Sequence, residues 1–218
     1  MSIAEIFAEK GYSVALGYFR HGEKVFDLAR RLGEKGVFAL PVQGDLSCFE
    51  EAKRAVEQIN SVFGGIDILI NNAGISSVGL FVDLDPDEWR KIVDTNLSSA
   101  IYTTRLVLEG MLQRGYGSVI NVSSIWGLEG GSLEVAYSAT KAGLVGFSKA
   151  LAKEVFPIRV NCVCPDITDT AMNDHLSAEE KAEYAKNTRT GRILTPSEVA
   201  LEIFRLAESG ESGQIISV

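Results

Sequence analysis

The sequence predicts an α/β fold, a doubly wound parallel sheet in a three-layer α/β/α arrangement. Short runs rich in Val, Ile and Leu alternate with helix-length amphipathic segments along all 218 residues. Several of these runs are continuously apolar, which is typical of strands that helices cover on both faces. The connections are short and favour right-handed crossovers, so one domain spanning residues 1–218 is expected.

Strands and helices are expected in strict alternation. The expected strands are Tyr12–Leu16, Val37–Val42, Ile66–Ile70, Ser118–Val122, Arg159–Cys164 and Gln214–Val218. The expected helices are Ile3–Lys10, Glu23–Lys35, Phe49–Phe63, Asp87–Met111, Val135–Val155 and Pro196–Ala207. Asp85-Pro86 and Thr195-Pro196 mark helix starts, because the missing N–H of proline costs nothing in the first turn. Gly64 follows an expected helix, where a left-handed cap favours glycine.

Composition and charge exclude several functional classes. The chain carries 21 basic and 29 acidic side chains, a net charge of −8, which disfavours a nucleic-acid-binding surface. The sequence has no apolar run of about 18 residues, so no membrane span is expected. Residues 1–6 lack the basic start and apolar stretch of a secretory signal. Three cysteines in such a chain are typical of a reducing compartment, so a cytoplasmic location is expected.

The sequence has too few cysteines and histidines to suggest a zinc-dependent hydrolase or a hydrolase with a catalytic triad. Cys162 and Cys164 are two residues apart on an expected strand, so they share a face and are interpreted as small buried side chains. No partners at metal-ligand spacing accompany them, and no metal site is expected. His21 and His175 are isolated, which disfavours a Ser-His-Asp arrangement.

Polar residues follow two neighbouring strands at the edge where ligands bind in sheets of this kind. Asn71-Asn72-Ala73-Gly74 combines amide groups with small residues, so that the backbone can approach a flat ligand closely. Ser124 follows the next strand, and Tyr137 and Lys141 lie at i and i+4 on one face of the next helix. Taken alone, the first motif is also explained as a turn, and the second as a surface tyrosine beside a solvated lysine.

In order and spacing, the set resembles the short-chain dehydrogenase/reductase family over essentially the whole chain. The residues that carry the resemblance are Asn71-Asn72-Ala73-Gly74, Asn96, Ser124, Tyr137 and Lys141. Within that family the chain is similar to bacterial 3-oxoacyl-[acyl-carrier-protein] reductases. Ser124–Leu128 and Glu134-Val135 also resemble elongation factor P 5-aminopentanone reductases, which act on a carbonyl of a modified lysine in another protein. A non-catalytic Rossmann-fold binding or scaffold protein is the alternative from another class.

The resemblance implies a Rossmann-like fold and hydride transfer between a nicotinamide cofactor and a ketone or alcohol. Tyr137 would donate a proton to the carbonyl oxygen, Ser124 would hydrogen-bond that oxygen, and Asn96 would hold a water linking Lys141 to solvent. A nearby ammonium favours a phenolate, so Lys141 is expected to lower the pKa of Tyr137. These side chains are expected to be the catalytic set.

The segment after the first expected strand predicts the cofactor. Gly17–His21 has no carboxylate for a ribose 2′-hydroxyl but has an arginine, so NADP(H) is expected, with Arg20 at the 2′-phosphate. A solvated surface charge is the alternative for Arg20. By family position the further cofactor contacts are Asp45 and Leu46 at the adenine, Asn72, Ala73 and Gly74 at its ribose, and Ile167 and Thr170 with Tyr137 and Lys141 at the nicotinamide.

The front of the chain departs from the family. Its members begin with a strand and a Thr-Gly-x-x-x-Gly-x-Gly turn for the diphosphate, whereas Met1–Ile6 resembles the helix that follows. The first strand and glycine-rich loop are therefore expected to be missing, which would leave the flanking strand edges unpaired. Three explanations are open: omitted segments, a truncated chain that binds the cofactor weakly, or a scaffold without catalysis. Asp166 stands where the family has glycine and is expected to repel cofactor phosphates or restrain its loop.

The remaining expectations concern substrate and partners. Thr168–Arg192, with a helix at Ala178–Lys186, is expected to cover the substrate. The resemblance implies a small or carrier-protein-linked ketone, with acyl carrier protein docking on basic residues such as Arg114 or Arg192, although both arginines are better explained as ordinary surface charges. It also implies a homotetramer, or a dimer, formed through the helices at Asp87–Met111 and Val135–Val155.

Overall fold

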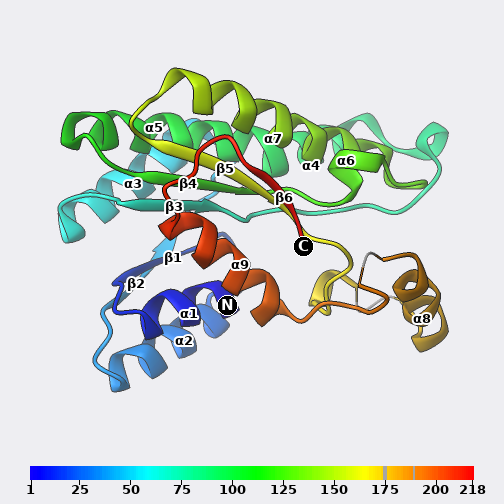
Figure 1. Ribbon diagram of the computed structural model, residues 1–218, viewed down its shortest axis with the longest axis horizontal. Helices are drawn as coiled ribbons and strands as arrows, with labels where there is room; N and C mark the ends of the chain where they lie inside the picture. The colour runs from blue at the N-terminus through cyan, green and yellow to red at the C-terminus, as the bar shows by residue number, and fades with distance from the viewer. Residues whose placement is uncertain (174–175, 189) are drawn as a thin grey trace.

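The computed structural model describes residues 1–173, 176–188 and 190–218, in which strands alternate with helices (Figure 1). The strands are β1 (Val14–Tyr18), β2 (Ala39–Gln43), β3 (Ile68–Asn71), β4 (Ser118–Val122), β5 (Arg159–Cys164) and β6 (Ile215–Ser217). The helices are α1 (Ser2–Glu9), α2 (Glu23–Glu34), α3 (Phe49–Phe63), α4 (Pro86–Val93), α5 (Ser99–Arg114), α6 (Trp126–Glu129), α7 (Val135–Glu154), α8 (Ala178–Asn187) and α9 (Pro196–Glu208). Short 3₁₀ turns cover Phe81–Asp83 and Ala171–Asn173.

The strands form two parallel sheets, β1-β2 and β3-β4-β5-β6. Helices α3, α5 and α7 cover one side, and α1, α2 and α9 cover the other (Figure 1). This confirms the predicted doubly wound α/β fold. All described helices are too short or too polar to cross a membrane.

The two sheets face each other across an internal gap. Among the described residues, β1 pairs only with β2 and β3 only with β4, so the facing edges of β1 and β3 are unpaired, as the sequence predicts. A cavity of about 740 Å³ lies between them and is lined by side chains from both edges, including Leu16 and Ile68. The β1-β2 sheet is held through α1, whose Phe7 ring contacts Phe204 of α9 at a centroid distance of 5.1 Å.

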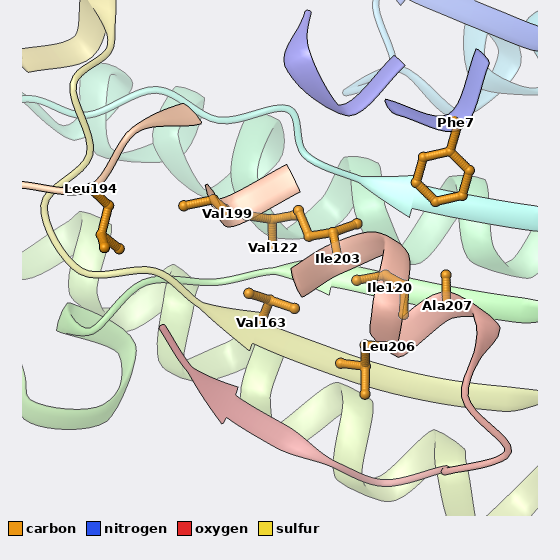
Figure 2. Close-up of a cluster of buried hydrophobic side chains, with 9 residues drawn as sticks. All are labelled: Phe7, Ile120, Val122, Val163, Leu194, Val199, Ile203, Leu206 and Ala207. Atoms are coloured by element: carbon orange, nitrogen blue, oxygen red, sulfur yellow. The ribbon is translucent and has the colours of Figure 1, made fainter. Parts of the chain in front are cut away.

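An apolar cluster under α9 joins both sides of that gap (Figure 2). Its buried members are Phe7, Ile120, Val122, Val163, Leu194, Val199, Ile203, Leu206 and Ala207. Ile120 and Val122 come from β4 and Val163 from β5, so the cluster anchors β4, which ends just before Ser124, and its neighbour β5. Burial of this many large apolar side chains makes β4 and β5 the rigid base of the site.

The helix starts follow the proline signals. Asp85 accepts a hydrogen bond from the backbone N–H of Asp87, and Thr195 forms a reciprocal capping box with Glu198. The single helix expected at Asp87–Met111 is wrong, because residues 94–98 form a π-helical turn between α4 and α5. In that turn the Asn96 side chain exchanges two hydrogen bonds with the backbone of Ile75, which explains why the helix opens at this point.

Backbone amides at the gap are expected to exchange quickly with solvent deuterium. Alternate amides of β3 point toward the unpaired edge, whereas β4 is hydrogen-bonded on both sides. We expect peptides covering β3 to exchange at least ~10-fold faster than peptides covering β4 in hydrogen–deuterium exchange mass spectrometry. Equal protection of the two strands would show that the β3 edge is covered in solution.

Candidate active site

The structure brings together the four residues predicted to be catalytic. Ser124 lies just beyond the end of β4, and Tyr137 and Lys141 face it from the first turns of α7. Asn96 approaches from the π-helical turn. All four are buried, with 1% of Asn96 and 3% of Lys141 exposed. Strand ends, a widened helical turn and one helix face therefore converge on one site.

Lys141 lies beneath the tyrosine ring. Its Nζ donates to the carbonyl oxygen of Val122 at 2.8 Å and is 5.5 Å from the centroid of the Tyr137 ring. Ser123 Oγ donates to the carbonyl oxygen of Lys141 at 2.8 Å and holds this part of α7 against β4. Gly127 permits that approach, since a Cβ there would come within 2.6 Å of Ser123 Oγ and 2.7 Å of the Lys141 carbonyl carbon.

Asn96 ties the loop after β3 to α7. Its Nδ2 donates to the carbonyl oxygen of Ile75 at 2.8 Å and to Thr140 Oγ1 at 3.2 Å, while its Oδ1 accepts from the Ile75 N–H at 2.8 Å. Both amide hydrogens are therefore used, and one lone pair of Oδ1 remains. The first effect of Asn96 is to position the loop 72–77 over Lys141.

Burial dominates the electrostatics of the Tyr137–Lys141 pair. Loss of solvent raises the pKa of Tyr137 to about 12, an effect that the hydrogen bond with Ser124 opposes and the charge of Glu134 reinforces. Loss of solvent also lowers the pKa of Lys141 to about 8. The prediction that the pKa of Tyr137 is lowered is therefore wrong for this structure. The lysine directs its hydrogen bond at Val122, and burial of the phenol is the largest cause of the raised pKa.

Cys162 and Cys164 pack behind the site. Both are fully buried on β5, and their sulfur atoms lie 4.0 Å apart on the face that meets α7. Their interpretation as small buried side chains on one face is confirmed. Among the described residues, no three His, Cys, Asp or Glu side chains come together as a metal site would require.

A network of hydrogen-bonded amide and hydroxyl side chains joins the strands and helices that carry the site. The sequence analysis did not predict this network. Asn71 Nδ2 donates to Asn121 Oδ1 at 2.8 Å, and Asn121 Nδ2 donates to Ser148 Oγ of α7 at 2.8 Å. Thr103 of α5 donates to Asn71 Oδ1 at 2.7 Å. The signal was present in the sequence, since an asparagine inside an apolar strand needs a buried partner.

The expected cofactor residues each lie just after a strand. The list is Arg20 after β1, Asp45 and Leu46 after β2, Asn72, Ala73 and Gly74 after β3, and Ile167 and Thr170 after β5. Arg20 is exposed, and it forms no ion pair within the described part of the chain; its guanidinium stacks on Phe19 at 4.8 Å. Asp45 is occupied locally, because its Oδ1 accepts from the N–H and Oγ of Ser47.

The loop after β3 passes close to Lys141. A Cβ at Gly74 would lie 3.5 Å from both Asn96 Oδ1 and Lys141 Nζ, in van der Waals contact with both. Asn72 and Ala73 are exposed at the cavity edge. These features fit the ribose and nicotinamide end of a dinucleotide, and the unpaired Arg20 fits a 2′-phosphate at the other end. The carboxylate of Asp166 accepts from the N–H of Ile167 at 2.8 Å, so it stabilises its own turn.

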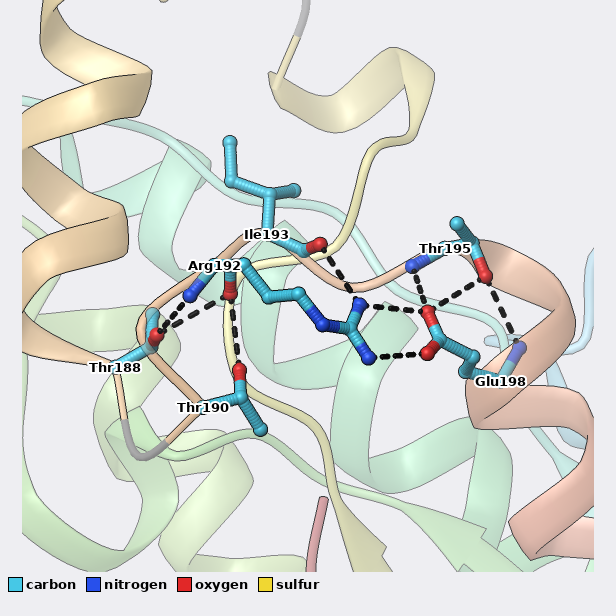
Figure 3. A network of polar contacts seen from close by, with 6 residues as sticks. All are labelled: Thr188, Thr190, Arg192, Ile193, Thr195 and Glu198. Carbon is cyan, nitrogen blue, oxygen red and sulfur yellow. Dashed lines mark hydrogen bonds and ion pairs between the residues drawn. The ribbon is translucent and has the colours of Figure 1, made fainter.

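Ion pairs hold the segment Thr168–Arg192, which is expected to cover the substrate, near its beginning and at its end. Lys181 of α8 forms an ion pair with Asp169 at 3.2 Å, and Arg192 forms a two-pronged ion pair with Glu198 of α9 (Figure 3). His175 lies outside the described residues, as do two others in this segment. Arg114, the other expected docking residue, is paired with Asp67 at 3.5 Å. Neither arginine presents an unpaired charge to a partner.

Comparison with known proteins agrees with this geometry. A family model described as short chain dehydrogenase matches residues 1–181. The chain belongs to the short-chain dehydrogenase family. This dehydrogenase is 38% identical to the 3-oxoacyl-[acyl-carrier-protein] reductase FabG of Chlamydia muridarum, over 99% of the chain and 89% of the relative. The FabG of Aquifex aeolicus is 36% identical over 100% of the chain and 90% of its own length. The uncharacterized oxidoreductase YmfI of Bacillus subtilis is 37% identical over 100% of the chain and 91% of its own length.

Family membership makes this short-chain dehydrogenase an oxidoreductase that acts on CH–OH groups with a nicotinamide cofactor. The residues described above fit such a cofactor at both ends. Residues 1–218 contain no Thr-Gly-x-x-x-Gly-x-Gly turn, the segment with which members of the family hold the diphosphate.

Proposed function

We propose that this chain reduces the ketone of a 3-oxoacyl thioester carried by acyl carrier protein to a secondary alcohol, using NADPH. The observation that carries the proposal is the burial of Ser124, Tyr137 and Lys141 around one point, under a loop positioned by Asn96. The names of the FabG relatives supply the substrate class.

Each side chain of the site has its own role in the proposed ketone reduction. Ser124 and Tyr137 hold the carbonyl oxygen between two hydroxyl groups, so that negative charge forming on it is stabilised. With its pKa raised to about 12, Tyr137 is fully protonated at neutral pH and so carries the proton that the carbonyl oxygen takes up. When bound, NADPH supplies the hydride at the face of the ketone. As Tyr137 gives up its proton, the Lys141 ammonium stabilises the phenolate, and the free lone pair of Asn96 Oδ1 can hold the water that restores the proton.

The proposal is tested with acetoacetyl thioester on acyl carrier protein. The expected result is oxidation of NADPH with formation of the 3-hydroxyacyl thioester, detected by absorbance and by mass spectrometry. Calorimetric titration with NADPH is the second measurement, since no heat of binding at high cofactor concentration would support a scaffold without catalysis. No turnover together with no binding would overturn the proposal.

Arg20 is expected to set the preference for NADPH over NADH. Because it is exposed and unpaired among the described residues, its charge is available for a 2′-phosphate. Arg20→Ala is expected to raise KM for NADPH about 10-fold and leave KM for NADH unchanged. Lys35→Ala, an exposed cation at the far end of α2, is the matched control. A wild-type preference for NADH would contradict this assignment.

We also propose one domain, assembly into a homotetramer or dimer, and a cytoplasmic location. Exposed apolar residues on α5 and at the start of α7, Ile101, Leu112 and Val135, support assembly through these helices. All three cysteines are free, which supports a reducing compartment. Light scattering after size exclusion measures the assembly.

A further inference from the structure

Thr140 carries a buried hydroxyl to which the reaction described above gives no role. The residue lies on α7 directly before Lys141, and 1% of it is exposed. Its Oγ1 donates to the carbonyl oxygen of Tyr137 at 2.7 Å and accepts from Asn96 Nδ2 at 3.2 Å. A hydroxyl has one hydrogen to donate, so the bond to Tyr137 leaves only lone pairs to face Asn96. Thr140 therefore joins Asn96 to the backbone of the residue that carries the phenol.

The backbone of Ile75 holds the Asn96 amide in one orientation. Asn96 Nδ2 donates to the carbonyl oxygen of Ile75 and Oδ1 accepts from the Ile75 N–H, each at 2.8 Å. Exchanging the nitrogen and oxygen atoms would break both bonds, so Nδ2 is the atom that faces Thr140. Thr140 takes the second hydrogen of Nδ2. Because 1% of Asn96 is exposed, this hydrogen would be a buried, unpaired donor without the threonine hydroxyl.

With both amide hydrogens bound, Asn96 can only accept a further hydrogen bond, through Oδ1. Oδ1 and Lys141 Nζ lie near each other, because both are 3.5 Å from the Cβ position of Gly74. Lys141 directs one hydrogen at Val122 and has others to donate. A water between Oδ1 and Nζ would therefore donate to Asn96 and accept from Lys141. A free amide hydrogen on Asn96 would allow the competing arrangement, in which Asn96 donates to the water.

We propose that Thr140 is a positioning residue that restricts Asn96 to accepting hydrogen bonds and thereby orients the water that returns a proton to Tyr137. This inference rests on the proposed ketone reduction. In that reaction Tyr137 gives one proton to the carbonyl oxygen in each turnover and regains one from solvent. The proton returns after hydride transfer, so Thr140 acts on the completion of the catalytic cycle and leaves the reduction step itself unchanged.

The test replaces Thr140 by valine, which keeps the branched shape but has no hydroxyl. In Thr140→Val, kcat for acetoacetyl thioester with NADPH is expected to fall about 10-fold, because a buried donor loses its partner. The value of kcat/KM for the thioester should stay within about twofold of wild type, since it reports only the steps through hydride transfer. The solvent isotope effect on kcat should rise, and the effect of deuterium at C4 of NADPH should shrink, as proton return limits turnover.

Two further variants separate the hydroxyl from its surroundings. Thr140→Ser keeps the hydroxyl and should have a kcat within about twofold of wild type. Thr104→Val removes a hydroxyl that is equally buried, on α5, and that accepts from Asn71 Nδ2 at 2.9 Å. This control should lower the free energy of unfolding without changing either isotope effect.

Nuclear magnetic resonance of the Asn96 side-chain amide supplies a readout that needs no turnover. The resonance of the hydrogen bound to Thr140 should move upfield in Thr140→Val and keep its position in Thr140→Ser. The resonance of the hydrogen bound to Ile75 should keep its position in both variants. If neither resonance moves in Thr140→Val, Thr140 does not hold the amide and the inference is wrong.

The kinetic outcomes decide the role in the reaction. Wild-type kcat in Thr140→Val overturns that role. Equal losses of kcat and kcat/KM with unchanged isotope effects also overturn it, because Thr140 would then act on the alignment of the substrate. If Thr140→Ser behaves like Thr140→Val, the hydroxyl is not the group that matters. If the wild-type chain reduces no ketone, the proposed function is overturned instead, and the Asn96 resonances still decide whether Thr140 holds the amide.

Discussion

Replacing Tyr137 by phenylalanine is expected to lower kcat for ketone reduction by ~10³-fold, within the range of lost general acid catalysis. The hydroxyl is the only group that the change removes, and it is the proposed proton donor, hydrogen-bonded with Ser124. The ring stays over Lys141 and the helix backbone is untouched, so the free energy of unfolding should change little. Steady-state rates with NADPH and a saturating ketone measure the effect.

A second tyrosine provides the control. Tyr116 is exposed and donates from Oη to Asp67 at 2.9 Å, near the amino-terminal end of β3 and far from the site. Tyr116→Phe removes an equivalent hydroxyl and should leave kcat within about twofold of wild type. If Tyr137→Phe retained comparable turnover, Tyr137 would not be the proton donor and the mechanism proposed above would be wrong.

The sequence predicted best those elements that carry strong local signals. The bounds of β4, β5 and α3 agree with the prediction at both ends. In β4 and β5 a mostly apolar run stops at Ser123 and at Pro165, and α3 is followed by Gly64, whose φ of +79° suits a left-handed cap. The π-helical turn was missed because its cause is not local. Asn96 widens the helix to reach Ile75, twenty-one residues earlier in the chain.

In the candidate site, too, features with a local sequence signal were predicted and features that depend on distant contacts were missed. Spacing and order were enough to place Ser124, Tyr137 and Lys141 together, because strand ends and helix faces bring such residues to one edge of a sheet. The Asn71–Asn121–Ser148 chain depends on pairing between strands distant in sequence, which no spacing reveals. The pKa values depend on burial in the folded state, so a sequence argument based on the nearest charge gave the wrong direction for Tyr137.

Lys141 links activity to pH, and its removal is the second large effect expected. Lys141→Met keeps a long apolar chain but removes the cation proposed to stabilise negative charge on Tyr137, so kcat should fall by ~10²-fold or more. Because the pKa of Lys141 is lowered to about 8, the wild-type rate of reduction should be level below pH 8 and decline above it. The variant should show a low rate without that decline. Lys149→Met, an exposed lysine two turns further along α7, should keep the wild-type profile.

Stability should change with pH in the opposite sense to the rate. In the folded chain Lys141 loses its proton near pH 8, below its ordinary pKa of 10.5, so the unfolded chain binds more protons between those values. The unfavourable burial of the ammonium is therefore present in full below pH 8 and is relieved as the pH rises. From pH 8 to 10 the wild type should gain about 1 kcal/mol per pH unit relative to Lys141→Met, measured by urea unfolding. A constant difference between the two proteins would show that Lys141 does not titrate in this range. The fall in rate above pH 8 would then have to come from another group.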